Sequence, residues 1–240
     1  MIENNMRRIQ ALEQAAHDLY REWFVDFKYP NHEDVPLVDS GTDYGMIPQG
    51  WEVVKLIDIC DLIMGQSPKS EFYNDDGLGL PFHQGVGTFG DYFPITQRWT
   101  TYEGRIARAG DILFSVRAPV GRINIADTRL VIGRGLSAIR HKEDCQTFIF
   151  EQLKSVFHRE DLIGGGTIFQ SVTKTDMENI KLLSPYISII REFEGITGTI
   201  TEEIYNLSTR NNALREARDL LLPRLVSGEL SVDDVEIEVS

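Results

Sequence analysis

Residues 187–222 read ISIIREFEGITGTITEEIYNLSTRNNALREARDLLL, and apolar side chains recur in this segment every seven residues. One series of positions comprises Phe193, Ile200, Leu207, Leu214 and Leu221, and its companion series comprises Ile190, Thr197, Ile204, Asn211 and Arg218. Alternating steps of three and four residues are typical of a coiled-coil seam. The segment therefore predicts a helix of roughly 50 Å that pairs with another helix.

The same segment carries signals for its register and its end. Asn211 is polar, and a buried asparagine in a seam lowers stability while it fixes the register and the choice of partner. Pro223 and Gly228 mark the expected stop of the helix, and the acidic residues 229–240 predict a frayed tail. A helix docked on its own domain is the alternative interpretation, which the five heptad steps disfavour.

A second amphipathic helix is predicted over residues 3–27. Its apolar positions are Ile2, Met6, Ile9, Leu12, Ala16, Leu19, Trp23 and Phe27. Tyr29-Pro30 should end this helix, because a proline disfavours helix at the residue before it. We expect the two helices to form an antiparallel coiled coil. Since a two-helix rod alone is marginal, we also expect further helices from a second copy or another subunit.

Between the two helices the sequence predicts an α+β fold with one mixed α/β globular domain. Short β-type runs at 111–117, 121–126 and 136–140 are bounded by turns, and 148–158 predicts a short helix. The predicted division of the chain is a helix at 1–28, a linker loop at 29–50, the globular domain at 51–185, the coiled-coil helix at 186–227 and an acidic tail at 228–240.

An arginine-rich segment, residues 98–142, contrasts with the rest of a chain whose net charge is −13. It contains three acidic residues and nine basic ones, which are Arg98, Arg105, Arg108, Arg117, Arg122, Arg129, Arg134, Arg140 and Lys142. Arginine pairs bidentately with phosphate oxygens and with guanine edges, so the segment is suited to bind a polyanion. A solvated sheet face with ordinary surface arginines explains the charge equally well.

The sequence offers no recognisable catalytic, metal-binding or membrane motif. The glycine run 163–168 lacks the Gly-Lys-Ser/Thr of a nucleotide-binding loop, and Gly133-Arg-Gly135 is too short for a dinucleotide fingerprint. The five histidines are scattered, and Cys60 and Cys145 lie far apart, so we expect no metal site and two reduced thiols. With no signal peptide and no apolar run of membrane length, we expect a cytoplasmic protein with no cofactor of its own.

Polar loop residues indicate a nucleic-acid surface instead. The segments 65–70 and 82–85 offer hydrogen-bonding side chains, including His83, and the glycine run with Thr167, Gln170 and Ser171 offers further donors to DNA phosphate. The predicted DNA-binding residues are Gln66, Ser67, Lys69, Ser70, Tyr73, Gln84, Arg98, Arg105, Arg117, Arg122, Arg134 and Lys174. Arg117 and Arg122 flank a tight turn, so a structural role is the alternative for both. The predicted helix-pairing residues are Ile9, Trp23, Ile200, Ile204, Leu207, Asn211, Leu214 and Leu221.

Several stretches, in order, resemble the specificity subunit of type I restriction-modification systems. Residues 4–27 resemble the helix before the second target-recognition domain of that family, IPQGWEV at 47–53 resembles the domain entry, and RDLLLPRLVSGE at 218–229 resembles the closing signature. The internal landmarks are GQSP at 65–68, LPFHQG at 80–85, GDILFSVRAPVG at 110–121, IGRGL at 132–136 and GTIF at 166–169. The resemblance covers nearly the whole chain.

The resemblance implies sequence-specific recognition of double-stranded DNA without catalysis by this chain. In that family, modification subunits bind S-adenosylmethionine and methylate adenine, and a separate restriction subunit uses ATP and Mg²⁺, so these cofactors are expected on partner subunits. Full-length members carry two recognition domains and this chain resembles a half-subunit with one, which pairs with a second copy as a homodimer or with another half-subunit. Two other hypotheses remain open: a helical adaptor whose arginines are incidental, and an enzyme with an unrecognised active site.

Overall fold

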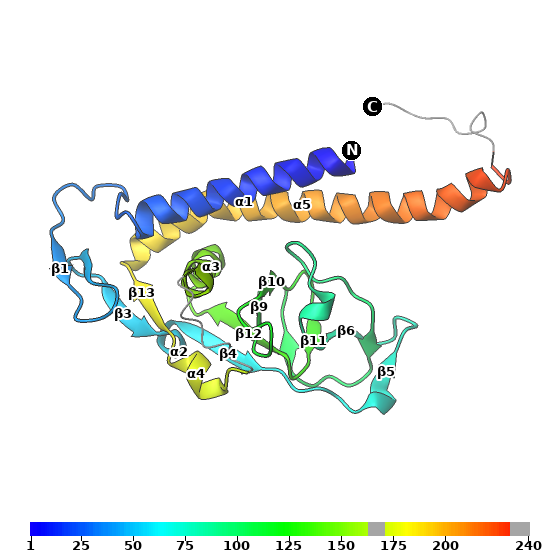
Figure 1. The fold of residues 1–240 in the computed structure, drawn as a ribbon, viewed down its shortest axis with the longest axis horizontal. Coiled ribbons are helices and arrows are strands. Elements are labelled where there is room, and N and C mark those ends of the chain that lie inside the picture. The colour runs from blue at the N-terminus through cyan, green and yellow to red at the C-terminus, as the bar shows by residue number, and fades with distance from the viewer. Residues whose placement is uncertain (163–170, 231–240) are drawn as a thin grey trace. The chain divides into compact units, whose positions relative to one another are not determined.

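The computed structural model describes residues 1–162 and 171–230 of the chain. Its two long helices are α1 (Ile2–Phe24) and α5 (Ile187–Val226), and most of the remaining elements are short strands (Figure 1). This arrangement confirms the predicted class, which is an α+β fold with a long helix near each end of the sequence and a sheet-rich domain between them.

The chain forms two compact units. The helical unit consists of Met1–His17 together with Gly198–Ser240, and the sheet unit consists of Asp18–Thr197. Both α1 and α5 contribute residues to each unit, whereas all strands belong to the sheet unit. The helical unit is therefore held together by helix pairing alone in its described part.

The two helices of the helical unit run antiparallel. The Asn5 side-chain amide donates to Asn211 Oδ1 at 2.9 Å, and Arg8 Nη2 lies 2.7 Å from Glu203 Oε1. As α1 advances from Asn5 to Arg8, the residue opposite it on α5 moves back from Asn211 to Glu203. The predicted antiparallel direction is correct, and the helices lie side by side in Figure 1.

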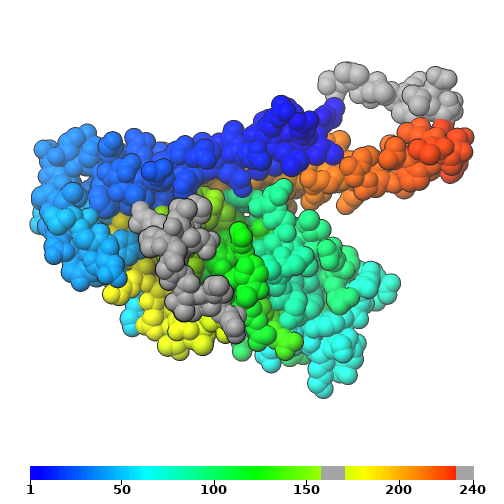
Figure 2. Space-filling model, in the orientation of Figure 1, coloured from blue at the N-terminus to red at the C-terminus, as the bar shows by residue number. Residues whose placement is uncertain are grey.

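The heptad pattern identifies the buried stripe of this helix pair. Its buried and half-buried positions include Ile9, Ile200, Ile204, Leu207, Asn211 and Leu214. Further along α5, Arg218 and Leu221 are exposed, because Asn5 already lies opposite Asn211 and α1 supplies only one more turn. The last turns of α5, red in Figure 2, extend beyond the blue end of α1.

The first helix ends three residues earlier than predicted. Phe24 is its last residue, and Phe27 takes a left-handed conformation with φ of 58°. The backbone N–H of Lys28 then donates to the Glu22 carbonyl at 2.8 Å, which closes the final turn. Capping by a left-handed residue thus ends the helix before Tyr29-Pro30 can do so.

The last helix continues through Pro223, contrary to the prediction that this proline helps to stop it. The helix ends at Val226, and the Ser227 N–H donates to the Pro223 carbonyl at 2.9 Å. A proline removes its own N–H but keeps its carbonyl, so a final turn can form after it. Gly228, with φ of 75°, provides the actual stop.

Two sheets make up most of the sheet unit. The antiparallel four-stranded sheet has the order β10 (Ile123–Ile125), β9 (Ile112–Ser115), β12 (Leu136–His141) and β4 (Cys60–Met64). The five-stranded sheet has the order β5 (Tyr73–Asn74), β7 (Trp99–Thr100), β6 (Leu80–His83), β11 (Leu130–Ile132) and β8 (Ile106–Ala107). Only the β6–β11 pair is parallel among these neighbours. The predicted runs 111–117, 121–126 and 136–140 are therefore strands, two of them shorter than expected.

The core of the sheet unit joins the two sheets. Leu113, Leu136 and Ala138 come from the four-stranded sheet, and Leu130 and Ile132 from the five-stranded one, and all are fully or almost fully buried. Because β11 belongs to one sheet and β12 to the other, the link between them, residues 133–135, crosses from sheet to sheet. This crossing sets the position of the loops described below.

Smaller elements complete the unit. The predicted linker 29–50 contains a hairpin of β1 (Leu37–Asp39) and β2 (Met46–Pro48), so it is not a simple loop. The helix predicted at 148–158 is longer and spans α3 (Gln146–Leu162). The other elements are β3 (Glu52–Lys55) paired with β13 (Lys181–Ser184), the short helices α2 (Leu56–Ile59) and α4 (Lys174–Glu178), and the 3₁₀ turns η1 (Ser70–Phe72) and η2 (Val86–Thr88).

The end of α1 and the start of α5 are anchored within the sheet unit by α3. Phe24 lies 4.8 Å from Phe148 and 5.1 Å from Phe193 between ring centroids, and all three rings are buried. Glu194 of α5 accepts the backbone N–H groups of Thr147 and Phe148 at 2.9 and 3.1 Å, so its carboxylate caps the first turn of α3. Aromatic packing and this cap together hold the start of α5 against α3 within the sheet unit.

Candidate nucleic-acid interface

The strands of the arginine-rich segment are buried, but most of its basic side chains lie at the surface. Eight of its nine basic residues are exposed, and Arg140 is half-buried. Arg140 Nε donates to Asp111 Oδ1 at 2.6 Å, and the Asp111 side chain is buried. Burial raises the pKa of the Asp111 carboxyl, and Arg140 acts against this rise. Arg140 therefore has a structural role, while the exposed basic side chains of the segment are accessible to a ligand.

Four loops converge at the junction of the two sheets and form what we call the loop cluster: Gly65–Ser70, His83–Gly85, Val116-Arg117 and Gly133–Gly135. Backbone hydrogen bonds join the cluster internally. They are Gly133 N–H to His83 carbonyl at 2.8 Å, Gly135 N–H to Gln84 carbonyl at 3.1 Å and Val116 N–H to Gly135 carbonyl at 2.9 Å. The first loop is tied to the link that follows β11, since the Gln66 N–H donates to the Ile132 carbonyl at 3.0 Å.

Glycine is required where these loops touch. A Cβ atom at Gly65 would lie 2.1 Å from the Gly133 carbonyl oxygen, and one at Gly135 would lie 2.5 Å from the Gln84 carbonyl oxygen. Both contacts are with backbone atoms that cannot move aside, so the 133–135 loop approaches the 65–70 and 83–85 loops only without side chains at these positions. The glycines of the GQSP and IGRGL stretches thus hold the cluster together.

Side chains of the cluster form a small polar network. The Ser67 hydroxyl donates to Gln84 Oε1 at 2.8 Å and accepts the Arg134 backbone N–H at 3.2 Å. Both Gln66 and Gln84 are exposed, and within residues 1–162 and 171–230 the Gln66 side chain makes no hydrogen bond. The network orients Gln84 and leaves amide groups available to an external ligand.

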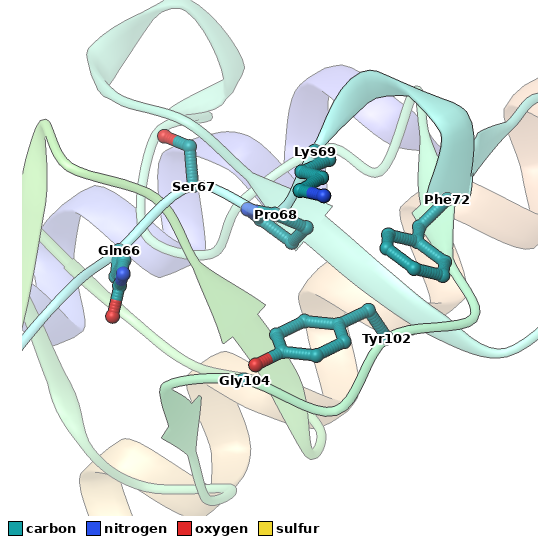
Figure 3. A pocket seen from close by; sticks show the side chains of 7 residues that line it. All are labelled: Gln66, Ser67, Pro68, Lys69, Phe72, Tyr102 and Gly104. Atoms are coloured by element: carbon teal, nitrogen blue, oxygen red, sulfur yellow. The ribbon is translucent and has the colours of Figure 1, made fainter.

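A cleft lies beside this network. Its lining residues are Gln66, Ser67, Pro68, Lys69, Phe72, Tyr102 and Gly104, and its volume is about 230 Å³. Figure 3 shows the Phe72 and Tyr102 rings side by side; Phe72 follows the loop that carries Gln66, and Tyr102 belongs to the loop that leads to Gly104. Phe72 and Tyr102 were not predicted as site residues, because sequence alone does not show that 72 and 102 meet. The only signal was a tyrosine in the polar stretch Thr101-Tyr-Glu-Gly104.

Tyr73 and Arg98 lie next to the cluster. The Tyr73 hydroxyl donates to the Pro68 carbonyl at 2.8 Å, and the Arg98 guanidinium lies 5.9 Å from the centroid of the Tyr73 ring. Arg98 Nε also lies 3.2 Å from Asp75 Oδ1 in an exposed ion pair. Exposed pairs of this kind contribute little stability, so Arg98 can exchange Asp75 for a phosphate oxygen.

Some of the remaining predicted residues lie at the loop cluster and others lie away from it. Arg105, Arg117 and Arg134 are exposed and belong to the first group. The Arg105 carbonyl accepts the Ile132 N–H at 2.9 Å, and Arg117 and Arg134 belong to two of the loops. Ser70 begins η1 directly after Lys69. Arg122 lies across the β9–β10 turn, where its N–H donates to Ser115 Oγ at 2.8 Å. Lys174 begins α4 and pairs with Glu178 at 3.3 Å, and none of its described contacts is with the cluster.

His83 does not face a ligand, contrary to its predicted part in this loop. Its side chain is fully buried, and its Nδ1 lies 2.9 Å from Thr88 Oγ1. Burial lowers the pKa of the imidazole to about 4, so the ring is neutral at pH 7. His83 is the last residue of β6, an inner strand of the five-stranded sheet on which Phe82 and His83 are both buried, whereas Gln84 follows the strand and is exposed.

Other sequence features lie elsewhere. The glycine run 163–168, with Thr167 and Gln170, falls outside the described residues. Cys60 and Cys145 are free and buried, and burial raises their pKa values to about 12 and about 11, so both thiols are protonated at neutral pH. Among residues 1–162 and 171–230, no three histidine, cysteine or acidic side chains gather as a metal site. No helix in that same part of the chain is long and apolar enough to cross a membrane.

Known proteins are similar in sequence to nearly the whole of this chain. The family model for the type I restriction modification DNA specificity domain matches residues 48–189. The putative type I restriction enzyme MjaX specificity subunit of Methanocaldococcus jannaschii is 35% identical over 230 residues, which cover 94% of this chain and 53% of that protein. The HindI specificity subunit of Haemophilus influenzae is 29% identical, with 92% of this chain and 51% of that protein covered. The chain thus spans about half the length of these curated relatives.

Solved structures show the same similarity. The HsdS subunit from Thermoanaerobacter tengcongensis matches with a TM-score of 0.58 and 29% identity, over 95% of this chain and 54% of that one. The type I restriction-modification S subunit from M. genitalium has a TM-score of 0.64 at 14% identity, over 93% of this chain and 56% of that one. At so low an identity the second match shows a shared fold alone.

Proposed function

Since the chain belongs to the type I restriction-modification DNA specificity family, we propose that it recognises a specific sequence of double-stranded DNA for a type I restriction-modification complex. The loop cluster is the proposed contact surface. Its exposed arginines bind phosphates, and its amide side chains contact base edges in the major groove. In this proposal the chain has no catalytic residues and directs adenine methylation and restriction by partner subunits in the cytoplasm.

One observation supports this proposal most strongly. Loops from 65–70, 83–85, 116–117 and 133–135 are far apart in sequence, yet backbone hydrogen bonds bring them to one place with Arg105, Arg117 and Arg134 exposed around it. Incidental surface arginines would not need a framework of glycines that joins four loops. A protein that acts only through helix pairing would not require this arrangement of loops either.

The proposal is tested by target selection from random duplexes with the purified chain and its modification subunits. We expect enrichment of one sequence and transfer of the methyl label from S-adenosylmethionine to adenine only when the modification subunits are present. Label transfer or Mg²⁺-dependent cleavage by the chain alone would support the enzyme hypothesis instead. Absence of any DNA binding would support the adaptor.

Cofactors are proposed to reside on the partners. S-adenosylmethionine would bind the modification subunits, and ATP with Mg²⁺ the restriction subunit. The buried, protonated thiols of Cys60 and Cys145 are consistent with a chain whose own side chains take no part in the chemistry.

We further infer that α5 pairs with another chain, either a second copy or a different half-subunit. The apolar residues Leu220, Leu222 and Val226 are 67%, 54% and 82% exposed on the turns of α5 that extend beyond α1. Covering them in a helical bundle would bury apolar surface that α1 leaves uncovered. Two identical copies related by a two-fold axis would then recognise a palindromic target split by a spacer.

A further inference from the structure

We propose that the cleft between the Gln66–Lys69 loop and the Tyr102–Gly104 loop recognises one A·T base pair of the target. Gln66 would bind the adenine edge, and the Tyr102 and Phe72 rings would contact the thymine methyl group. This inference rests on the proposed function, because it requires the loop cluster to face the major groove of DNA.

The polar side of the cleft fits adenine. Gln66 is exposed at the cleft, and its amide offers both a donor and an acceptor that no other described residue uses. In the major groove adenine presents an acceptor at N7 and a donor at N6, which one glutamine amide can bind bidentately. Gln84 is a weaker candidate for the same role, because the Ser67 hydroxyl already occupies its Oε1.

The apolar side fits the other base of the same pair. The Tyr102 ring is 49% exposed and lies 5.4 Å from the Phe72 ring at 33° between planes. A Cβ atom at Gly104 would lie 2.9 Å from Tyr102 Cε1, so this glycine lets the ring lie close against the backbone. The structure therefore holds an aromatic surface in place beside a free amide. Thymine is the base that presents a methyl group in the major groove, next to its paired adenine.

The geometry disfavours an unstacked base as the occupant. A base inserted between the two rings would need about twice the ~3.4 Å stacking distance of bases, which exceeds their separation. Lys69 is the one cation among the residues that line the cleft, and Arg105 directly follows Gly104 in the sequence. In this proposal these two cations bind phosphates while Gln66 and Tyr102 meet the base edges.

The test uses the selected target with single-atom changes in the bases. Replacing each thymine in turn by deoxyuridine removes only the methyl group, and we expect one position to weaken binding by about fourfold. Replacing the adenine paired with it by 7-deazaadenine removes N7 and should weaken binding by about tenfold. Both are measured as dissociation constants of the complete chain at fixed salt.

Variants then assign the effects to residues. The deoxyuridine ratio is the dissociation constant for the deoxyuridine target divided by that for the thymine target. This ratio should fall to one with Tyr102→Ala and stay near four with Tyr102→Phe, which separates a lost contact from a misfolded domain. With Gln66→Ala the 7-deazaadenine ratio should fall to one. Tyr205→Ala, an exposed tyrosine of the helical unit, is the matched control and should leave both ratios unchanged.

The outcomes distinguish this inference from the function on which it rests. If selection yields no target, the proposed function fails. If a target is selected but contains no sensitive thymine, or if Tyr102→Ala keeps the fourfold ratio, only the cleft assignment is overturned. The inference is supported if deoxyuridine at one thymine weakens binding of the wild type, Tyr102→Phe and Tyr205→Ala about fourfold but no longer weakens binding of Tyr102→Ala.

Discussion

Individual residues decide whether the loop cluster can form and what it can contact. Gly65 and Gly135 allow the backbones of three loops to meet, and the Ser67 hydroxyl binds the Gln84 side chain and the Arg134 backbone N–H. The exposed charges of Arg105, Arg117 and Arg134 surround these contacts. At this scale, packing and ligand contact are separate tasks, carried by different residues that are neighbours in sequence.

The cluster depends on Gly65 having no side chain. Gly65→Ala places a methyl group 2.1 Å from the Gly133 carbonyl oxygen, and we expect a loss of about 2 kcal/mol or more in the free energy of unfolding, together with weaker DNA binding. Urea unfolding and anisotropy measure the two effects. Gly87→Ala is the control, because no atom lies within 4 Å of a Cβ there. Equal stability of both variants would contradict the close approach.

Buried His83 makes stability depend on pH. Its folded pKa of about 4 lies below the value of 6.5 that histidine has in an unfolded chain, so protonation favours the unfolded state as the pH falls through this window. We expect about 2 kcal/mol less stability at pH 5 than at pH 8 from this group. Comparing urea unfolding of the wild type and His83→Gln at both pH values isolates the contribution of His83 to the free energy of unfolding. An equal pH dependence in the two proteins would show that His83 does not titrate as described.

Sequence could predict many of the residues at the interface, but not their geometry. Gln66, Ser67, Lys69 and Gln84 follow from polar chemistry beside glycines, and the structure brings these four together. Phe72 and Tyr102 could not be predicted, because their meeting depends on the fold of the five-stranded sheet. Charge counting also could not reveal that Arg140 is engaged by a buried carboxylate.

Sequence patterns predict the long helices of this chain more reliably than its short strands. The heptad repeat of α5 predicted its buried stripe and antiparallel partner, since a long period leaves little ambiguity. The predicted end of α1 was wrong by three residues, because a left-handed Phe27 ends the helix early, and the helix-stopping role predicted for Pro223 was wrong, although the predicted helix 186–227 ends within one residue of Val226. The β1–β2 hairpin was missed because its strands have three residues each.

The Asn5–Asn211 pair should fix the register of the two helices. Asn211→Leu leaves the Asn5 amide buried without its partner, and we expect a loss of about 1–3 kcal/mol. The double variant Asn5→Leu/Asn211→Leu should regain that stability but allow alternative registers. Thermal unfolding measures stability, and crosslinking of Arg8→Cys to Glu203→Cys with a short bifunctional thiol reagent measures register. A double variant no more stable than the single one would contradict this role.

At the scale of the whole molecule, the chain combines a helical unit held by a heptad seam with a sheet unit that carries the loop cluster. The family match covers 48–189, which lies within the sheet unit. In the proposed function the sheet unit recognises DNA and the helical unit sets the spacing of two half-sites, so we expect the two to be changed independently. Sequence periodicity predicted the pairing of the helices, whereas the meeting of the four loops depends on the fold.

Helix length should therefore set the spacer of a split target. Adding one heptad to both helices of the helical unit lengthens the rod by roughly 10 Å, which corresponds to about three base pairs. In a paired assembly we expect the selected spacer to change while each half-site keeps its sequence. Target selection with the lengthened chain measures both. An unchanged spacer would show that the helices do not determine it.

The salt dependence of DNA binding tests the central claim, that the loop cluster contacts DNA phosphates, most directly. The logarithm of the affinity should fall linearly with the logarithm of the salt concentration, and Arg105→Ala/Arg117→Ala/Arg134→Ala should reduce the slope by about three. Arg210→Ala, an exposed arginine on α5, is the control and should leave the slope unchanged. Equal slopes for the wild type and the triple variant would contradict the account.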